Sequence, residues 1–217
     1  MRLSRPRAAL FDWDNTLVDS FGVIHKAYNE TLAAMGLPTW TYEETCTRVA
    51  RSMRESFPGL FGERWREARE RFYAAYAAHH LDFVRPLPGA ADLLAALNGS
   101  GVYLGVVSNK NGSHLRREVT HFGWRDYFGR VVGAADAAED KPSAAPVMLA
   151  LEGSGVAPGR DVWFVGDNAI DIACAEAAGC LPVIVGGAVR TGNAKALRDV
   201  AWRFADCHEL AAVVRRF

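Results

Sequence analysis

Carboxylates and hydroxyls in this sequence stand directly after short apolar runs. Asp12 and Asp14 follow the first run. Ser108 and Asn109 follow a second run, and Asp167 follows a later one. Carboxylates gathered at one place repel each other unless a positive charge lies among them. Hard oxygen ligands suit Mg²⁺, which proteins usually hold with few carboxylates to act on a phosphate. These residue types therefore indicate chemistry on a phosphate.

The same residues can divide the work of phosphoryl transfer. One carboxylate can attack phosphorus, and a second one two residues on can handle protons. The Ser108 hydroxyl and neighbouring backbone N–H groups can face a phosphate where a helix begins. Lys141, in a later loop, adds a compact positive charge for the phosphoryl oxygens. The set predicts transfer from a small phosphorylated molecule.

Strands and helices alternate over most of the chain and would bring these residues together. Parallel strands with helices on both sides follow from this alternation, and open parallel sheets bind ligands beyond the carboxyl ends of their strands. Strands are expected at 7–12, 102–107, 130–133, 161–166 and 181–186, with an edge strand at 201–204. Helices are expected at 90–97, 113–122, 144–151, 168–178 and 209–214.

Residues 18–85 interrupt the alternation and contain no credible strand. Helices are expected at 21–35, from Tyr42 with Thr41 as its cap, and at 63–80. Pro86, Pro88 and Gly89 mark a boundary before the sheet pattern resumes. We therefore predict a helical domain, residues 18–86, inserted into an α/β core made of residues 1–17 and 87–217.

Composition narrows the class of protein. The 217 residues carry 25 basic and 25 acidic side chains, so the chain lacks the basic field that nonspecific nucleic-acid binding uses. No apolar run is long enough for a membrane span or a secretion signal. The four cysteines are scattered, which favours buried, reduced thiols and a cytoplasmic location. The oligomeric state, monomer or homodimer, is left open.

Four short motifs then resemble a known family. DWDNT, VVSN, DKP and GDNAID are similar, in content and order, to the four motifs of the haloacid dehalogenase-like phosphatases. The helical insertion resembles the small cap of the phosphoglycolate phosphatase-like and β-phosphoglucomutase-like members. The resemblance covers residues 7 to about 187 and implies a Rossmann-like parallel-sheet core with an inserted all-helical cap.

The resemblance also implies roles for individual residues. Asp12 would be the nucleophile that forms an aspartyl-phosphate, and Asp14 the proton donor and acceptor. Ser108, Asn109 and Lys141 would bind the phosphoryl group, and Lys141 would also act in catalysis by neutralising the charge of the phosphate and the nucleophile. Thr16 would belong to the phosphate-binding loop and support it by hydrogen bonding. The Mg²⁺ site implied by the resemblance comprises Asp12, Asp14, Asp167 and Asp171. Trp13 and Asn15 depart from the usual Phe and Gly, and neither side chain is assigned chemistry.

Other interpretations stay open at this stage. A phosphomutase shares every core motif, and a non-catalytic binding module can use the same fold. Asp171 can be a helix cap with a purely structural role. Arg48, Arg51 and Arg54 can bind an anionic tail of the substrate, as can Lys110, whereas the arginines of 64–71 alternate with glutamates and indicate a solvated helix face. A closing cap leaves little room for a macromolecule, so we expect a small phosphomonoester.

Overall fold

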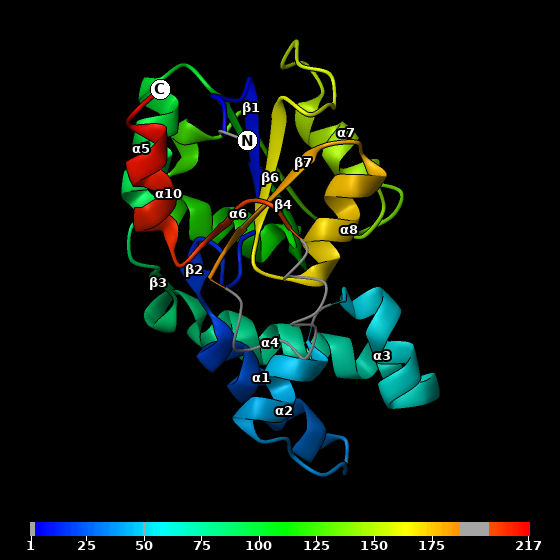
Figure 1. Ribbon diagram of the computed structural model, residues 1–217. Coiled ribbons are helices and arrows are strands. Elements are labelled where there is room, and N and C mark those ends of the chain that lie inside the picture. The colour runs from blue at the N-terminus through cyan, green and yellow to red at the C-terminus, as the bar shows by residue number, and fades with distance from the viewer. Residues whose placement is uncertain (1–2, 50, 187–199) are drawn as a thin grey trace.

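The computed structural model describes residues 3–49, 51–186 and 200–217. Its helices and strands alternate along most of the chain (Figure 1). In chain order they are β1 (Ala8–Phe11), β2 (Val18–Asp19), α1 (Phe21–Ala34), α2 (Tyr42–Arg48), α3 (Met53–Phe61), η1 (Gly62–Arg64), α4 (Trp65–Phe83), β3 (Arg85–Pro86), α5 (Ala90–Gly99), β4 (Tyr103–Asn111), α6 (Gly112–His121), η2 (Arg125–Tyr127), β5 (Arg130–Ala134), α7 (Ala145–Leu151), β6 (Val162–Gly166), α8 (Ala169–Ala177), β7 (Leu181–Val185), β8 (Arg203–Phe204) and α10 (Cys207–Val214).

A parallel sheet forms the core, in the strand order β5-β4-β1-β6-β7-β8. The short β1 lies between β4 and β6, with Ala8 opposite both Tyr103 and Val162. All four residues of β1 are buried, as expected for a strand covered on both faces. The predicted parallel α/β fold is confirmed, and β8 is the predicted edge strand.

Helices cover both faces of the sheet. Ala9 and Phe11 of β1 pack into one apolar cluster with residues of α5, α6 and α10. Ala8 and Leu10 pack into the other cluster, with residues of α7 and α8. Figure 1 shows α5 and α10 on one side of the strands and α7 and α8 on the other. The alternation along β1 therefore divides its side chains between two apolar layers.

Helices α1 to α4 lie together beyond one end of the sheet (Figure 1). We call residues 21–83 the helical segment. It has an aromatic core in which Tyr28 of α1 contacts Phe72 of α4 at 4.9 Å and Phe57 of α3 at 5.8 Å between ring centroids. The helix cap predicted at Thr41 is present, and Glu44 completes it as a capping box. The predicted division of the chain at residues 17 and 86 stays a prediction.

The helical segment begins and ends at a two-stranded ribbon. Val18 pairs with Pro86 and Asp19 with Arg85 in antiparallel β2 and β3. The prediction that residues 18–85 contain no strand is therefore wrong at both ends. Two-residue strands show no alternation in a sequence, so the pattern could not reveal them. The ribbon holds the two connections of the helical segment side by side.

Two further elements differ from the sequence prediction. Helix α3 was not predicted, and it carries Pro58 in its interior, where proline usually argues against a helix. Strand β4 extends to Asn111, so Ser108 and Asn109 lie within its last four residues and not beyond its end. Element boundaries are the least certain part of a sequence pattern because end residues carry little periodicity.

Expectations for the cysteines and for the charged face of α4 are confirmed. The four cysteines are free and buried. Glu67 pairs with Arg64 and Arg71 on the exposed face of α4 and its entry. Within residues 3–49, 51–186 and 200–217, no helix combines the length and the apolar character needed to cross a membrane.

Candidate active site

Three neighbouring strands deliver the site. Strands β4, β1 and β6 are adjacent and parallel, so their carboxyl ends meet at one edge of the sheet. The Asp12 backbone N–H donates to the Val165 carbonyl at 2.9 Å, which places Asp12 beside the end of β6. Ser108, Asp12 and Asp167 thus come together as the strand pattern predicted. All three side chains are buried.

Lys141 is the positive centre of this edge. Its ammonium donates to Asp12 Oδ1 and to Asp171 Oδ1, both at 2.7 Å. Burial alone would lower the pKa of Lys141, but the two carboxylates raise it above its ordinary value, so the ammonium persists. The Asn109 side chain fixes the lysine backbone, accepting from its N–H at 3.0 Å and donating to its carbonyl at 3.1 Å.

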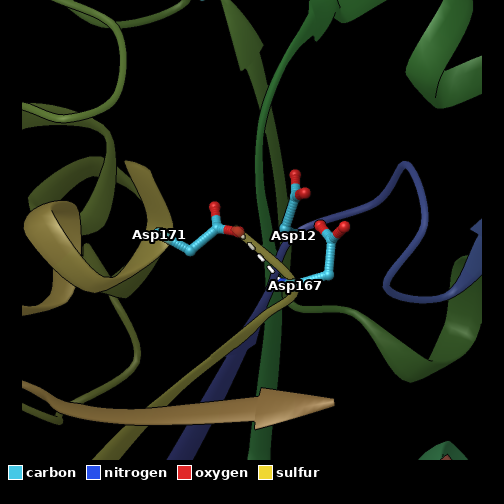
Figure 2. A group of neighbouring side chains, drawn as sticks. All are labelled: Asp12, Asp167 and Asp171. Carbon is cyan, nitrogen blue, oxygen red and sulfur yellow. Dashed lines mark hydrogen bonds between the residues drawn. The ribbon is translucent and has the colours of Figure 1, made fainter. Parts of the chain in front are cut away.

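Asp171 is held from two sides. Its Oδ2 accepts from the backbone N–H groups of Asp167 and Asn168, at 3.1 and 3.0 Å, while Oδ1 accepts from Lys141. Figure 2 shows the first of these bonds. The bond to Asn168 completes a capping box at the start of α8. Gly166 allows the approach, because a Cβ there would overlap the Asp171 carboxyl group. Asp171 is therefore both a helix cap and a partner of Lys141.

The site holds more negative than positive charge. Figure 2 shows the carboxylates of Asp12, Asp167 and Asp171 converging, and one oxygen of each lies within 4.8 Å of the others. Burial, with the charges of Asp171 and Asp14, raises the pKa of Asp12 to about 7 although Lys141 opposes the shift. Burial and the charges of Asp171 and Asp12 raise the pKa of Asp167 well above its ordinary value. Oxygen ligands with surplus charge in a buried cluster fit a divalent cation.

The other predicted site residues lie close to this group. The Thr16 hydroxyl donates to Asp167 Oδ1 at 3.4 Å, and Thr16 faces a neighbouring cavity, not the pocket above Asp12. Asp14 lines the pocket, but its carboxylate is outside the cluster of three acids. Asn15, where the family usually has glycine, sits at φ 60° in the loop after β1. Asparagine adopts this left-handed conformation more readily than most residues.

A second buried lysine connects Asp14 to an acid that sequence reasoning missed. Lys110 Nζ lies 2.6 Å from Asp14 Oδ1 and 2.8 Å from Glu118 Oε2. The Ser20 hydroxyl also donates to Asp14 Oδ1. Lys110, a candidate for holding a substrate tail, is instead engaged by these two carboxylates. Asp14 is thereby fixed at one oxygen by a lysine of β4 and by a hydroxyl at the start of α1.

Glu118 of α6 joins the sheet core to the helical segment. One of its oxygens accepts from Trp13 Nε1 at 2.7 Å. The other accepts from the Tyr76 hydroxyl and lies by His80 Nδ1, both at 2.8 Å. Burial alone would raise the pKa of Glu118, but the charge of Lys110 and the hydrogen bonds lower it to about 2. The signal for this role was present, since Glu118 shares the apolar face of α6 with Leu115.

An open pocket lies between the strand ends and the helical segment. It encloses about 850 Å³ of space, open solvent at its mouth included. Its floor comprises Asp12, Asp14, Ser108, Asn109, Lys141 and Asp167. Of the three arginines considered for an anionic tail, Arg51 lines the pocket. Arg48 pairs with Glu44 and Arg54 with Asp140.

The fold and this floor define an α/β enzyme of phosphoryl chemistry, and comparison with known proteins agrees. The model of the family described as haloacid dehalogenase-like hydrolase matches residues 9–185. The chain therefore belongs to the haloacid dehalogenase-like hydrolases, and it is an enzyme of the phosphatase type. Two relatives are named phosphoglycolate phosphatase. The one from Chromobacterium violaceum is 31% identical over 86% of this chain and 87% of its own length. The one from Pectobacterium atrosepticum is 32% identical over 94% and 92%.

Solved structures show the same fold. A predicted phosphoglycolate phosphatase from Haemophilus somnus superposes with a TM-score of 0.85 at 24% identity, covering 97% of this chain and 99% of that one. A predicted phosphatase from Clostridium acetobutylicum gives 0.85 at 20% identity, with 99% and 100% covered. Sequence identities at this level support the shared fold. The description of the site rests on the contacts and distances within this chain.

We expect the variant Glu118→Ala to lower the free energy of unfolding by about 3–5 kcal/mol, because it leaves the buried Lys110 ammonium without one of its counter-charges. Glu67→Ala is the matched control. Glu67 lies at the surface, where ion pairs are screened by solvent, so losing its pairs should destabilise the fold much less. Urea unfolding of both variants and the wild type measures the difference. Equal losses would show that the Glu118 contacts add nothing to stability.

The stabilisation by Glu118 should also depend on pH. The pKa of this group falls from 4.5 to about 2 on folding, so its contribution is complete above about pH 4.5 and is lost as the pH falls toward 2. The stability gap between wild type and Glu118→Gln should therefore narrow over that interval. Urea midpoints at pH 6, 4 and 3 test this. A constant gap across the three would contradict it.

Proposed function

We propose that this chain is a Mg²⁺-dependent phosphatase that hydrolyses a small phosphomonoester through an aspartyl-phosphate on Asp12. One observation carries the proposal. The Asp12 carboxylate lies at the pocket floor with Oδ1 held by Lys141, inside a cluster of three buried acids that fits a cation. Among the described residues, Asp12 Oδ2 accepts no hydrogen bond, which leaves it to attack phosphorus.

The neighbouring side chains supply the remaining roles. Asp14, held at Oδ1 by Lys110, would protonate the leaving oxygen and then take a proton from the attacking water. Ser108 and the backbone N–H of Asn109 would bind the phosphoryl oxygens, and Lys141 would offset their charge. Thr16 would support Asp167 through its hydroxyl.

Mg²⁺ would be held by Asp12 and Asp167, with the backbone carbonyl of Asp14. When bound, it neutralises the surplus negative charge and polarises the phosphoryl group. Both Asp171 oxygens accept hydrogen bonds from protein groups, which favours a role in orienting Lys141 and the strand end over direct ligation. The acids therefore divide between holding the cation and holding the lysine.

Residues 18–86 would act as a cap over the pocket, joined to the core at the β2–β3 ribbon. Closure would exclude water during attack on phosphorus and admit only a small ester. Phosphoglycolate belongs among the esters to be tested because relatives carry the name phosphoglycolate phosphatase. A cytoplasmic location agrees with the free, buried thiols and stays a prediction.

The first test is release of inorganic phosphate from a panel of esters, with Mg²⁺ and with a chelator. The panel contains phosphoglycolate, benzyl phosphate, sugar phosphates, nucleotides and p-nitrophenyl phosphate. We expect release only with Mg²⁺, and a loss of at least about a thousand-fold in Asp12→Asn because the nucleophile is gone. Asp161→Asn, an exposed acid far from the pocket, is the control. Activity retained by Asp12→Asn would refute the assignment, and an isomerised sugar phosphate would indicate a mutase.

The role of Asp14 predicts a dependence on the leaving group. Asp14→Asn should lower kcat/KM for an alkyl phosphate by about 10²–10⁴, because an alkoxide needs a proton to depart. The loss should be much smaller for p-nitrophenyl phosphate, whose anion leaves without one. The ratio of the two losses, measured under identical conditions, is the readout. Equal losses on both esters would exclude Asp14 as the general acid.

Surplus charge in the acid cluster predicts a stability effect of the cation. Mg²⁺ should raise the melting temperature of the wild type, since a ligand that binds only the folded state stabilises it. Asp167→Asn should melt higher than the wild type in chelator, because it removes a repelling charge, and should gain little from Mg²⁺. Thermal scans with and without Mg²⁺ measure both effects. A wild-type gain from Mg²⁺ that Asp167→Asn keeps in full would remove Asp167 from the cation site.

A further inference from the structure

The pocket has a charged floor and an apolar upper wall. The floor holds the acids and lysines already described. The helical segment supplies the wall opposite, which contains Ile24 and Tyr28 of α1, Met53 at the start of α3, and Phe72, Tyr73 and Tyr76 of α4. An ester bound with its phosphoryl group beside Asp12 would extend its alcohol part toward these side chains.

Both buried lysines of the pocket are already committed to acids. Lys141 contacts Asp12 and Asp171, and Lys110 contacts Asp14 and Glu118, all within 2.8 Å. Each ammonium therefore has two counter-charges within the protein. A carboxylate on the substrate would therefore have to compete with a protein carboxylate for either lysine.

His114 adds an aromatic surface and no charge. Its ring lies 5.4 Å from the ring of Tyr73 and 5.3 Å from that of Tyr76, between centroids. Burial, with the nearby His80 and Lys110, lowers the pKa of His114 to about 4, so the ring is neutral at pH 7. It continues the aromatic wall along α4 into the core side of the pocket.

Arg51 is the remaining positive group that the described residues contribute to the pocket lining. Its side chain is 69% exposed and lies 3.8 Å from Glu55 on the next turn. An exposed, solvated guanidinium with a partner of its own gives a weak interaction with an added anion. Arg51 therefore marks the mouth of the pocket, while the apolar wall lies deeper.

We propose that the alcohol released from the phosphate ester carries an uncharged apolar ring or chain, which packs against the wall formed by Met53, Tyr73 and Tyr76. The inference rests on the proposed function and specifies its substrate class. In the reaction the bond from phosphorus to the alcohol oxygen breaks, water supplies the new oxygen on phosphorus, and the alcohol oxygen gains a proton. The apolar group differs from glycolate, whose carboxylate this wall cannot pair.

Benzyl phosphate and phosphoglycolate make a matched test, because both release a primary alcohol and differ in what that alcohol carries. We expect kcat/KM, measured with Mg²⁺, to favour benzyl phosphate by about tenfold or more, mainly through KM, as burial of an aromatic ring should give. Met53→Gln keeps the length of the side chain and adds a polar amide. It should lower the ratio of benzyl phosphate to phosphoglycolate about tenfold. Met148→Gln makes the same change at an exposed position of α7 and should leave the ratio unchanged.

Three results would overturn the inference. A preference for phosphoglycolate that Arg51→Met abolishes would make Arg51 the anchor of an anionic tail. Hydrolysis of a sugar phosphate or nucleotide well above benzyl phosphate would assign the wall to a polar alcohol. A ratio that Met53→Gln leaves unchanged would remove the wall from substrate selection. Failure of the proposed function is a different outcome, in which no ester of the panel releases phosphate.

Discussion

Surplus negative charge around a single buried ammonium is the constraint on which the site depends. Lys141 can pair with two carboxylates at once, yet the strand ends bring a third acid, Asp167, into the same cluster. Every surrounding element helps to hold this unfavourable group. The start of α8 fixes Asp171, and Gly166 makes room for it. Packing of the sheet and its helices holds these three carboxylates together, although their charges repel one another.

Pairing of charge explains the contrast between the two halves of the pocket. In the part of the pocket next to Asp14, Lys110 lies between Asp14 and Glu118. Glu118 in turn accepts a hydrogen bond from Tyr76 on α4. Each lysine is therefore satisfied within the protein. What the helical segment then presents to the pocket is mostly aromatic and aliphatic surface. Under the proposed function, the floor would act on phosphorus and the wall would select the remainder of the ester by shape and apolar contact.

Sequence patterns anticipated the parts of the molecule that repeat or that follow a strand. The buried runs predicted the parallel sheet, and their ends predicted Asp12, Ser108 and Asp167. Glu118 was missed because its place on the apolar face of α6 marks a buried acid but does not identify its partners, of which Tyr76 is 42 residues away in the sequence. Helix α3 escaped because Pro58 argues against a helix unless packing compensates. Residues positioned by local periodicity were therefore predictable, and those positioned by tertiary contact were not.

The β2–β3 ribbon bears on how freely this enzyme can change. Because Val18–Asp19 and Arg85–Pro86 run side by side, the chain returns to the sheet almost where it left it. In the topology of the sheet, the whole helical segment therefore acts as one loop between β2 and β3. The entropic cost of closing a loop grows only slowly with its length. Evolution can lengthen, shorten or substitute the helical segment beyond the ribbon while the acids and the lysine at the strand ends keep their positions. A family with one chemistry can in this way acquire many substrates.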